Sequence, residues 1–286
     1  MSILRLHWDN NLAFAADYAA QVLGDAGDGH VCFKTALVGT GPLSRRIPGT
    51  EAWPYREAAV WRLGLQEEPQ ERPVITVLKK KGGMTILGYE KNWKHIAWMR
   101  PGRRSVENTE DVVSALQARY GYYAAVHLLE CCDGDRMTVP DQVKLMSATS
   151  VLISPGGGIA SVLNFLRPSA TAVPLTAFNT QTNRSVSLDY VFYPQMETPR
   201  IVEFPVSLKE YEKTSDRPGC ELPTDNWRYA MDGALIHCNL RFGPEGTQRL
   251  MQHVDAALLH WAERNGRYEV LQPLQKLAAA QAARPT

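Results

Sequence analysis

The segment VLISPGGGIASVLNFL, residues 151–166, constrains the fold of this chain more than any other. Its apolar run at 151–153 is typical of a buried strand, and three glycines then precede an apolar segment at helical spacing. Glycine has no Cβ, so the backbone can turn sharply and approach a ligand closely. A helix that begins after such a turn directs unpaired N–H groups and the positive end of its dipole toward an anion. The segment therefore predicts a phosphate-binding turn, although a tight turn without a ligand has the same pattern.

A dinucleotide site is one alternative for this segment, and the spacing argues against it. Gly156, Gly158 and Ser161 occupy the three glycine positions of G-x-G-x-x-G, so serine replaces the last glycine. A ribose-binding acidic residue should follow about 20 residues later. Residues 176–187 contain no Asp or Glu, and Asp189 is the first acidic residue beyond them. We therefore do not expect NAD, while another nucleotide-dependent Rossmann enzyme stays an alternative.

Strand and helix patterns alternate along the middle of the chain. The periodicity predicts strands over residues 74–78, 124–129, 151–153 and 171–175, and helices over 108–121, 140–146 and from the glycines to about 166. This alternation predicts an α/β fold, a Rossmann-type parallel sheet with helices on both faces. Ligands of such sheets bind beyond the carboxyl ends of the strands, where residues 154–158 would lie. Further helices are expected over 11–23, near 53–63, over 246–265 and from 271, the last fading into a disordered tail.

Composition narrows the class of protein. The net charge of +1 over 286 residues gives no reason to expect a nucleic-acid partner or an acidic membrane surface. The N-terminus has no apolar signal core, and no stretch is long enough for a transmembrane segment, so we expect a cytoplasmic protein. The cysteines are odd in number and lack metal-ligand spacing, which predicts reduced, buried thiols at Cys32, Cys131, Cys132, Cys220 and Cys238.

Several motifs come in an order that resembles glycosyltransferase family 61. That family has a helix with Gln, an apolar strand, His-Gly-Ala-Gly-Leu, and an apolar helix that leads into Phe-Leu-Pro. The corresponding residues here are 141–143, 151–153, 156–159 and 165–168, with spacing off by about one residue. Residues 6–10, 31–39 and 74–81 are similar to further segments of the family, and the resemblance covers residues 31–176 best.

Three positions depart from the family pattern. Pro155 stands where the family has His, Ser150 where it usually has Asp, and Lys79 or Lys80 where it usually has Arg. Proline cannot hydrogen-bond a phosphate or a base, and lysine keeps the charge of arginine without its bidentate fork. The missing His leaves open a non-catalytic relative that binds a nucleotide sugar or a glycan.

The resemblance implies a GT-B-like fold, in which two Rossmann-type domains enclose the active cleft. We expect a shortened acceptor-side domain over residues 1–70, a nucleotide-sugar-binding domain over 71–245, and C-terminal helices over 246–286 that pack back across the domains. The implied reaction is inverting transfer of a sugar from a nucleotide sugar, with a UDP-sugar favoured, to a hydroxyl of a glycan or glycoprotein acceptor.

The resemblance also implies roles for particular residues. Transfer needs groups that stabilise the leaving diphosphate, and these are expected without a metal or other cofactor from Lys79, Lys80, Ser154, Gly156, Gly157, Gly158 and Ile159. Asp133 and Asp135 are interpreted as part of a solvated loop. His7 and Asp9 are the candidates for the general base that takes the acceptor proton, although Asp9 also fits a helix cap. Residues 173–177 are candidates for a base and ribose pocket, and tryptophans 53, 61, 93 and 98 for either a sugar cleft or core packing.

Overall fold

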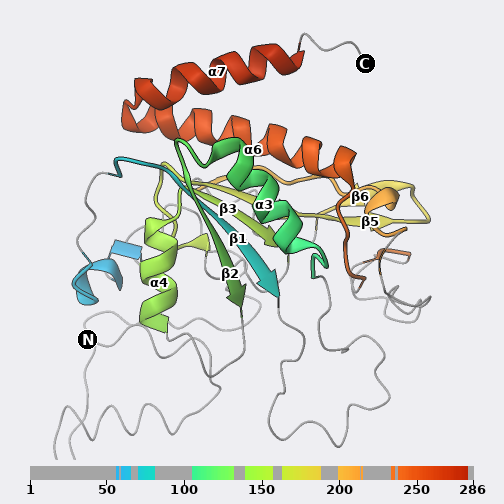
Figure 1. The fold of residues 1–286 in the computed structure, drawn as a ribbon. Coiled ribbons are helices and arrows are strands. Elements are labelled where there is room, and N and C mark those ends of the chain that lie inside the picture. Colours follow the sequence, from blue (N-terminus) through green and yellow to red (C-terminus); the bar gives the residue numbers. More distant parts are fainter. Residues whose placement is uncertain are drawn as a thin grey trace, which may run out of the picture.

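A five-stranded parallel sheet forms the centre of the fold (Figure 1). The computed structural model describes residues 56–57, 59–65, 70–80, 105–131, 139–156, 163–187, 199–212, 214, 233–235 and 238–282. Its strands lie in the order β2-β1-β3-β4-β7, and each neighbouring pair is parallel. Their bounds are β1 (Val74–Lys80), β2 (Ala125–Cys131), β3 (Val151–Pro155), β4 (Thr171–Leu175) and β7 (Arg200–Ile201). The predicted parallel sheet is confirmed.

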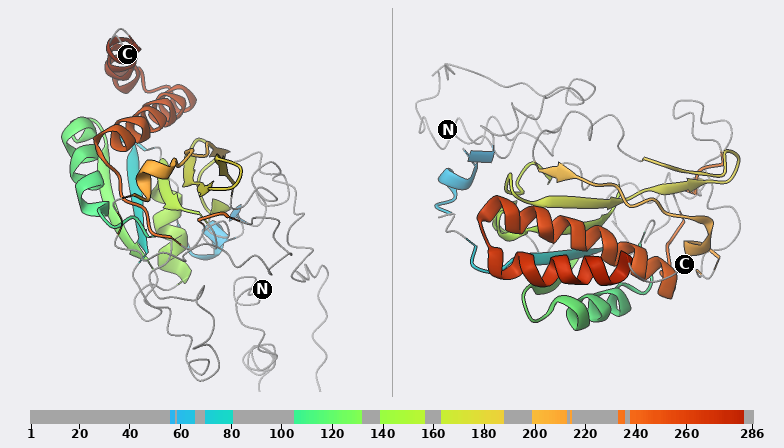
Figure 2. Two further views of the ribbon diagram at one scale, coloured as in Figure 1. Left: turned by 90° about the vertical axis from the view of Figure 1, so that its right-hand side faces the viewer. Right: turned by 90° about the horizontal axis from the view of Figure 1, so that it is seen from above.

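Helices cover both faces of this sheet, as the alternation predicts (Figure 2). On one face lie α3 (Thr109–Tyr120) and α6 (Pro244–Asn265), and α7 (Tyr268–Ala282) packs against α6. On the other face lie α4 (Val139–Ala148) and the helical residues 59–62. The last helix differs from expectation, because it begins before residue 271 and continues through Pro273 to Ala282.

The strands divide their side chains between two hydrophobic clusters. Successive residues of a strand point to opposite faces, so Val151 and Ile153 pack with α3 and α6 while Leu152 packs with α4. The α4 cluster also contains Ala59 and Val60, which come from the stretch assigned by sequence to a separate N-terminal domain. The domain boundary near residue 70 stays a prediction, but these two residues bury their side chains against the sheet unit.

A β-hairpin beyond β4 has no counterpart among the predicted elements. It consists of β5 (Ala177–Asn179) and β6 (Arg184–Val186), which pair antiparallel. Asn183, in the connecting turn, has a φ of 52°, a left-handed conformation that asparagine tolerates better than most residues. The strands are too short to show a clear period of two, which is why the pattern did not reveal them.

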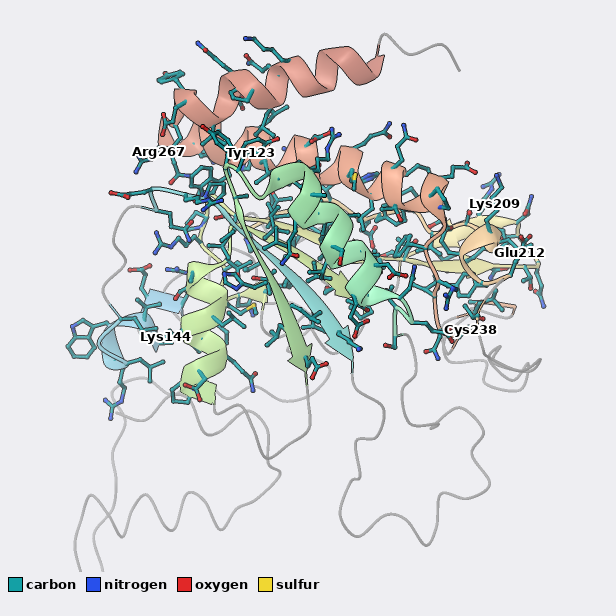
Figure 3. All side chains as sticks on the ribbon, viewed as in Figure 1. Tyr123, Lys144, Lys209, Glu212, Cys238 and Arg267 are labelled. Atoms are coloured by element: carbon teal, nitrogen blue, oxygen red, sulfur yellow. The ribbon has the colours of Figure 1, made fainter. Side chains whose placement is uncertain are left out.

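Cys238 corrects one expectation from the sequence. It is buried and disulfide-bonded rather than a free thiol, and its partner is a cysteine whose side chain lies outside the described residues. Figure 3 shows Cys238 toward the end of the molecule where α6 begins, with Lys209 and Glu212, while Tyr123 and Arg267 lie at the opposite end. Disulfides are rare in cytosolic proteins, so this bond argues against the cytoplasmic location, which stays a prediction.

The disulfide gives a simple chemical prediction. Two of the five cysteines are joined, so we expect at most three thiols to react in the unfolded, unreduced protein. Titration with a thiol reagent in denaturant, before and after reduction, measures the difference. Five reactive thiols before reduction would contradict the bond.

His260 on α6 makes stability depend on pH. Burial lowers the pKa of its imidazole below the usual value of about 6.5, and Arg200 and Arg264 add to the effect, while Glu263 opposes it. The unfolded chain therefore binds a proton at a higher pH than the folded one, and stability is lost as pH falls from 6.5 through the folded pKa. We expect the melting temperature of His260→Gln to fall less between pH 7.5 and pH 5 than that of the parent. Equal falls would contradict a lowered pKa of His260 as the cause of the pH dependence.

Candidate functional site

The side of the sheet on which successive strands are added reverses between β1 and β3, although all the strands are parallel. The chain passes from β1 to β2 on one side, then crosses back to β3 on the other side, and continues to β4 and β7. In open α/β sheets of this order, ligands bind beyond the carboxyl ends of the strands at the reversal. At this edge β1 ends with Lys79 and Lys80, and β3 ends with Ser154 and Pro155, followed by Gly156. Val77 pairs with Ile153, so the two strand ends lie side by side.

Ser154 is the most informative side chain at this edge. It is fully buried, and its Oγ has no hydrogen-bond partner among the described residues. Among the other buried hydroxyls in and beside this sheet, those of Thr76 and Thr149 bond each other at 2.8 Å, whereas that of Thr171 also has no partner among the described residues. A buried polar atom without a partner is costly, and each such case calls for an explanation such as a ligand, a water or a neighbour outside the described residues.

Lys79 has carboxylates for partners. Its Nζ donates a hydrogen bond to Glu110 of α3 and lies 3.8 Å from Glu130 of β2. The hydrogen bond from Lys79 lowers the pKa of the Glu110 carboxyl, so Glu110 is ionised near neutral pH. A phosphate that used Lys79 would have to compete with both carboxylates. Lys80 is the last residue of β1, in register with Cys131, and its side chain lies outside the described set.

A known protein family resembles the part of the chain that contains this edge. Residues 50–173 match the family model described as glycosyltransferase 61. The match confirms, over this segment, the resemblance to glycosyltransferase family 61. The match runs from before the helical residues 59–62 into β4 and so includes the reversal between β1 and β3. No curated protein matches the chain.

The match to family 61 supports glycosyltransferase activity in general, with a sugar donor and a glycan acceptor. Among the described residues, no helix is both long and apolar enough to cross a membrane. The same residues contain no group of three or more side chains suited to a metal ion.

The departures from the family 61 pattern lie at opposite edges of the sheet. Pro155, at the position of the family's His, ends β3 beside the candidate site. Ser150 precedes β3 at the other edge, where its Oγ accepts from the Val74 N–H at 3.1 Å and donates to Gln70 Oε1 at 2.8 Å. The Trp261 indole N–H donates to the same Gln70 oxygen at 3.2 Å. Ser150 therefore joins strand and helix far from the site, whereas Pro155 and the lysines that end β1 lie at the carboxyl edge, where a ligand would bind.

In the predicted base pocket, the polar side chain is already hydrogen-bonded within the protein. Thr176 is the polar residue of the segment 173–177, and it is buried. Its Oγ1 accepts from the Val206 N–H at 2.9 Å and donates to the Phe204 carbonyl at 3.0 Å. Val173 and Leu175 lie in the hydrophobic core. We therefore expect any hydrogen bond from this segment to a base or ribose to come from its backbone.

Several predicted site residues lie outside the described part of the chain. These are His7, Asp9, Gly157, Gly158 and Ile159, so their roles stay predictions. Trp61 is described and is 80% exposed, so it does not belong to the core; tryptophans 53, 93 and 98 are outside. Asp133 and Asp135 form an Asp-x-Asp sequence shortly after β2, also outside the described residues. Such a pair could hold a divalent ion with a diphosphate, so the absence of a metal requirement needs a direct test.

Proposed function

We propose that this chain is an inverting, metal-independent glycosyltransferase of the GT-B type. In this proposal it moves a sugar from a nucleotide sugar, with a UDP-sugar favoured, to a hydroxyl of a glycan or glycoprotein acceptor. The match to family 61 supports the general class, and the parallel sheet supports a nucleotide-binding unit. The domain division at residues 70 and 245 belongs to the same proposal.

One observation carries the donor side of the proposal. The buried Ser154 hydroxyl lacks a partner among the described residues at the strand reversal, and the three glycines begin two residues later. A diphosphate bound there would supply the missing acceptor for this hydroxyl. Backbone N–H groups of the glycine turn would donate to the phosphate oxygens, as at other helix N-termini.

The chemistry divides between the two sides of the cleft. The acceptor oxygen attacks the anomeric carbon while the bond to the diphosphate breaks, and the acceptor proton passes to a base. His7 or Asp9 is the proposed base. Negative charge grows on the leaving diphosphate, which the glycine N–H groups, Lys79 and Lys80 would stabilise. Lys79 can contribute only by exchanging Glu110 or Glu130 for the phosphate.

The proposal is tested by thermal shift with UDP, GDP, CMP and NAD, each with and without a divalent ion. A ligand at about 100 times its Kd stabilises the folded state by roughly 2.7 kcal/mol. We expect a metal-independent rise with UDP. A rise with UDP that requires the ion would overturn metal independence and direct attention to Asp133 and Asp135. A rise with NAD alone would favour a different Rossmann enzyme.

A second candidate function follows from Pro155. With no imidazole at this position, the chain could bind a nucleotide sugar or a glycan without turnover. The two candidates differ in product: a transferase releases free UDP when donor and acceptor are both present, whereas a binding protein gives a thermal shift and no UDP.

Ser154→Ala tests the contribution of Ser154 to UDP binding separately from its contribution to stability. Removing a buried, unpaired hydroxyl should leave the unfolding free energy unchanged or raise it by about 1 kcal/mol. If the hydroxyl serves the diphosphate, UDP affinity should fall by roughly three- to tenfold. Thr171→Val is the matched control, because the Thr171 hydroxyl is also buried and unpartnered among the described residues, but Thr171 is the first residue of β4 and lies at the amino edge of the sheet. Equal UDP affinity in Ser154→Ala and the parent would remove Ser154 from the site.

A further inference from the structure

The turn between β5 and β6 carries a sequence motif that neither the fold nor the proposed function explains. Residues 183–185 read Asn-Arg-Ser, which matches the Asn-x-Ser/Thr acceptor motif of N-linked glycosylation, in which x is not proline. It is the one such motif in the 286 residues of the chain. A motif of three residues also arises by chance, so its meaning depends on where the structure places it.

The structure places this motif at the exposed tip of the hairpin. Asn183 lies in the connecting turn and is exposed, and so are Arg184 and Ser185 at the start of β6. The hairpin lies at the end of the molecule where α6 begins (Figure 1). Exposed loop tips tolerate added groups, and a bulky, strongly hydrated glycan belongs on such a surface.

The turn does not depend on the Asn183 side chain. The Asn179 Oδ1 accepts hydrogen bonds from the N–H groups of Gln181, at 3.0 Å, and Thr182, at 2.9 Å, and so holds the turn. No hydrogen bond joins the side-chain amide of Asn183 to another described residue. A sugar attached to its Nδ2 would therefore break no hydrogen bond among the described residues of the hairpin.

The hydroxyl of the motif is bonded within the folded hairpin. Ser185 Oγ lies 2.5 Å from Thr176 Oγ1, and the Thr176 side chain is buried. Transfer needs this hydroxyl as well as the asparagine of the motif. We therefore expect the glycan to be attached before the hairpin closes, while Ser185 is still free of Thr176.

The disulfide of Cys238 indicates a compartment in which such a transfer takes place. Disulfides persist in secreted proteins and in the lumen of the endoplasmic reticulum, and they are rare in the cytosol. Cys238 also lies close to the hairpin in the fold, because its N–H donates to the Leu235 carbonyl and the Leu235 N–H donates to the Phe178 carbonyl of β5. The two features point to the same compartment independently of each other.

We propose that Asn183 is an N-glycosylation site that is filled in an oxidising secretory compartment. The co-substrate is a lipid-linked oligosaccharide diphosphate. The Asn183 Nδ2 forms a bond to the anomeric carbon of the first sugar, the bond from that carbon to the diphosphate oxygen breaks, and Nδ2 gives up one proton. The lipid diphosphate leaves. The chain is here the acceptor of a glycan made by other enzymes, so the site does not depend on the proposed transferase activity.

The full chain, translated into endoplasmic-reticulum microsomes behind a cleavable leader peptide, tests the site. Protection from added protease shows entry into the lumen. We expect one glycan, which peptide N-glycosidase F removes with conversion of the asparagine to aspartate. Asn183→Gln and Ser185→Ala should each abolish it, and Ser185→Thr should keep it. Ser187→Ala is the matched control, because it removes a hydroxyl directly after β6, bonded to Glu203, and leaves the motif intact.

A chain that enters without gaining a glycan, or that does not enter at all, would overturn the proposal, and so would a glycan that persists in Asn183→Gln. The glycosylated protein should melt no lower than the same protein after enzymatic removal of the glycan, because the turn loses no hydrogen bond. A lower melting temperature would contradict a tip that accommodates the glycan. Cys238 of the glycosylated chain should resist alkylation until it is reduced, and a free thiol there would contradict the shared compartment.

Discussion

Asp255→Ala is expected to lower the unfolding free energy by about 3 kcal/mol, among the largest effects of any single substitution in the described residues. Asp255 is buried on α6 and accepts hydrogen bonds from the Tyr120 hydroxyl at 2.7 Å and from Arg119 Nη2 at 2.8 Å. Both donors end α3, so these bonds join the two helices on that face of the sheet. Removing the carboxylate leaves a mostly buried guanidinium without this counter-ion.

Two further variants show how much of the loss comes from the Tyr120 hydrogen bond and whether burial of the carboxylate is what makes it large. Tyr120→Phe removes the hydroxyl but keeps the ring, and should lose about 1 kcal/mol. Burial raises the pKa of the Tyr120 phenol, so it stays a neutral donor throughout the usual pH range. Glu245→Ala removes a carboxylate from the exposed pair with Lys209 and should leave the denaturation midpoint unchanged. Urea denaturation measures all three; similar losses in Asp255→Ala and Glu245→Ala would contradict the buried network.

Gly157→Asp is expected to weaken UDP binding by at least about 30-fold relative to Gly157→Asn. The two side chains have the same shape and differ by one negative charge. At about 4 Å from a phosphate, with an effective dielectric constant near 20, that charge is worth roughly 4 kcal/mol. Each 1.4 kcal/mol is about tenfold in affinity, so even half of this repulsion gives a factor of nearly 30.

The asparagine variant is the control for the loss of glycine itself. Any cost of adding a side chain at this turn appears in both variants, so their ratio isolates the electrostatic effect. Raising the salt concentration should narrow the gap, because screening weakens the repulsion. If aspartate and asparagine bind UDP equally, the glycine run is a turn without a diphosphate, and the donor site must be sought elsewhere.

Local patterns predicted much of the fold. The strand 171–175 was predicted with the bounds that the structure has, and β1, α3, β2, α4, β3, β4 and α6 follow in the predicted order. The helix predicted from the glycines to about residue 166 lies mostly outside the described residues and stays a prediction. Periods of two and 3.6 residues are properties of a short stretch of chain, so they can be read without knowing its neighbours. The hairpin at 177–186 was missed for the same reason, since its strands of three residues are too short to carry a period.

The candidate site was predicted in its location and only partly in its residues. Ser154 lies at the end of β3 and Gly156 directly follows the strand, at the carboxyl edge where ligands of parallel sheets bind. The carboxylates beside Lys79 were not predicted, because Glu110 and Glu130 come from α3 and β2 and approach only when the strands align.

The sequence by itself determined the class of the fold, because strand and helix periods that alternate along the chain favour a parallel sheet covered by helices. Tertiary structure decided what each polar residue does. Ser150 and Ser154 are four residues apart in the sequence, yet one is bonded at the amino edge of the sheet and the other is buried and unpartnered, among the described residues, at the carboxyl edge. The difference arises because a hydrogen-bond partner is supplied by distant segments, and only the order of the strands brings those segments together.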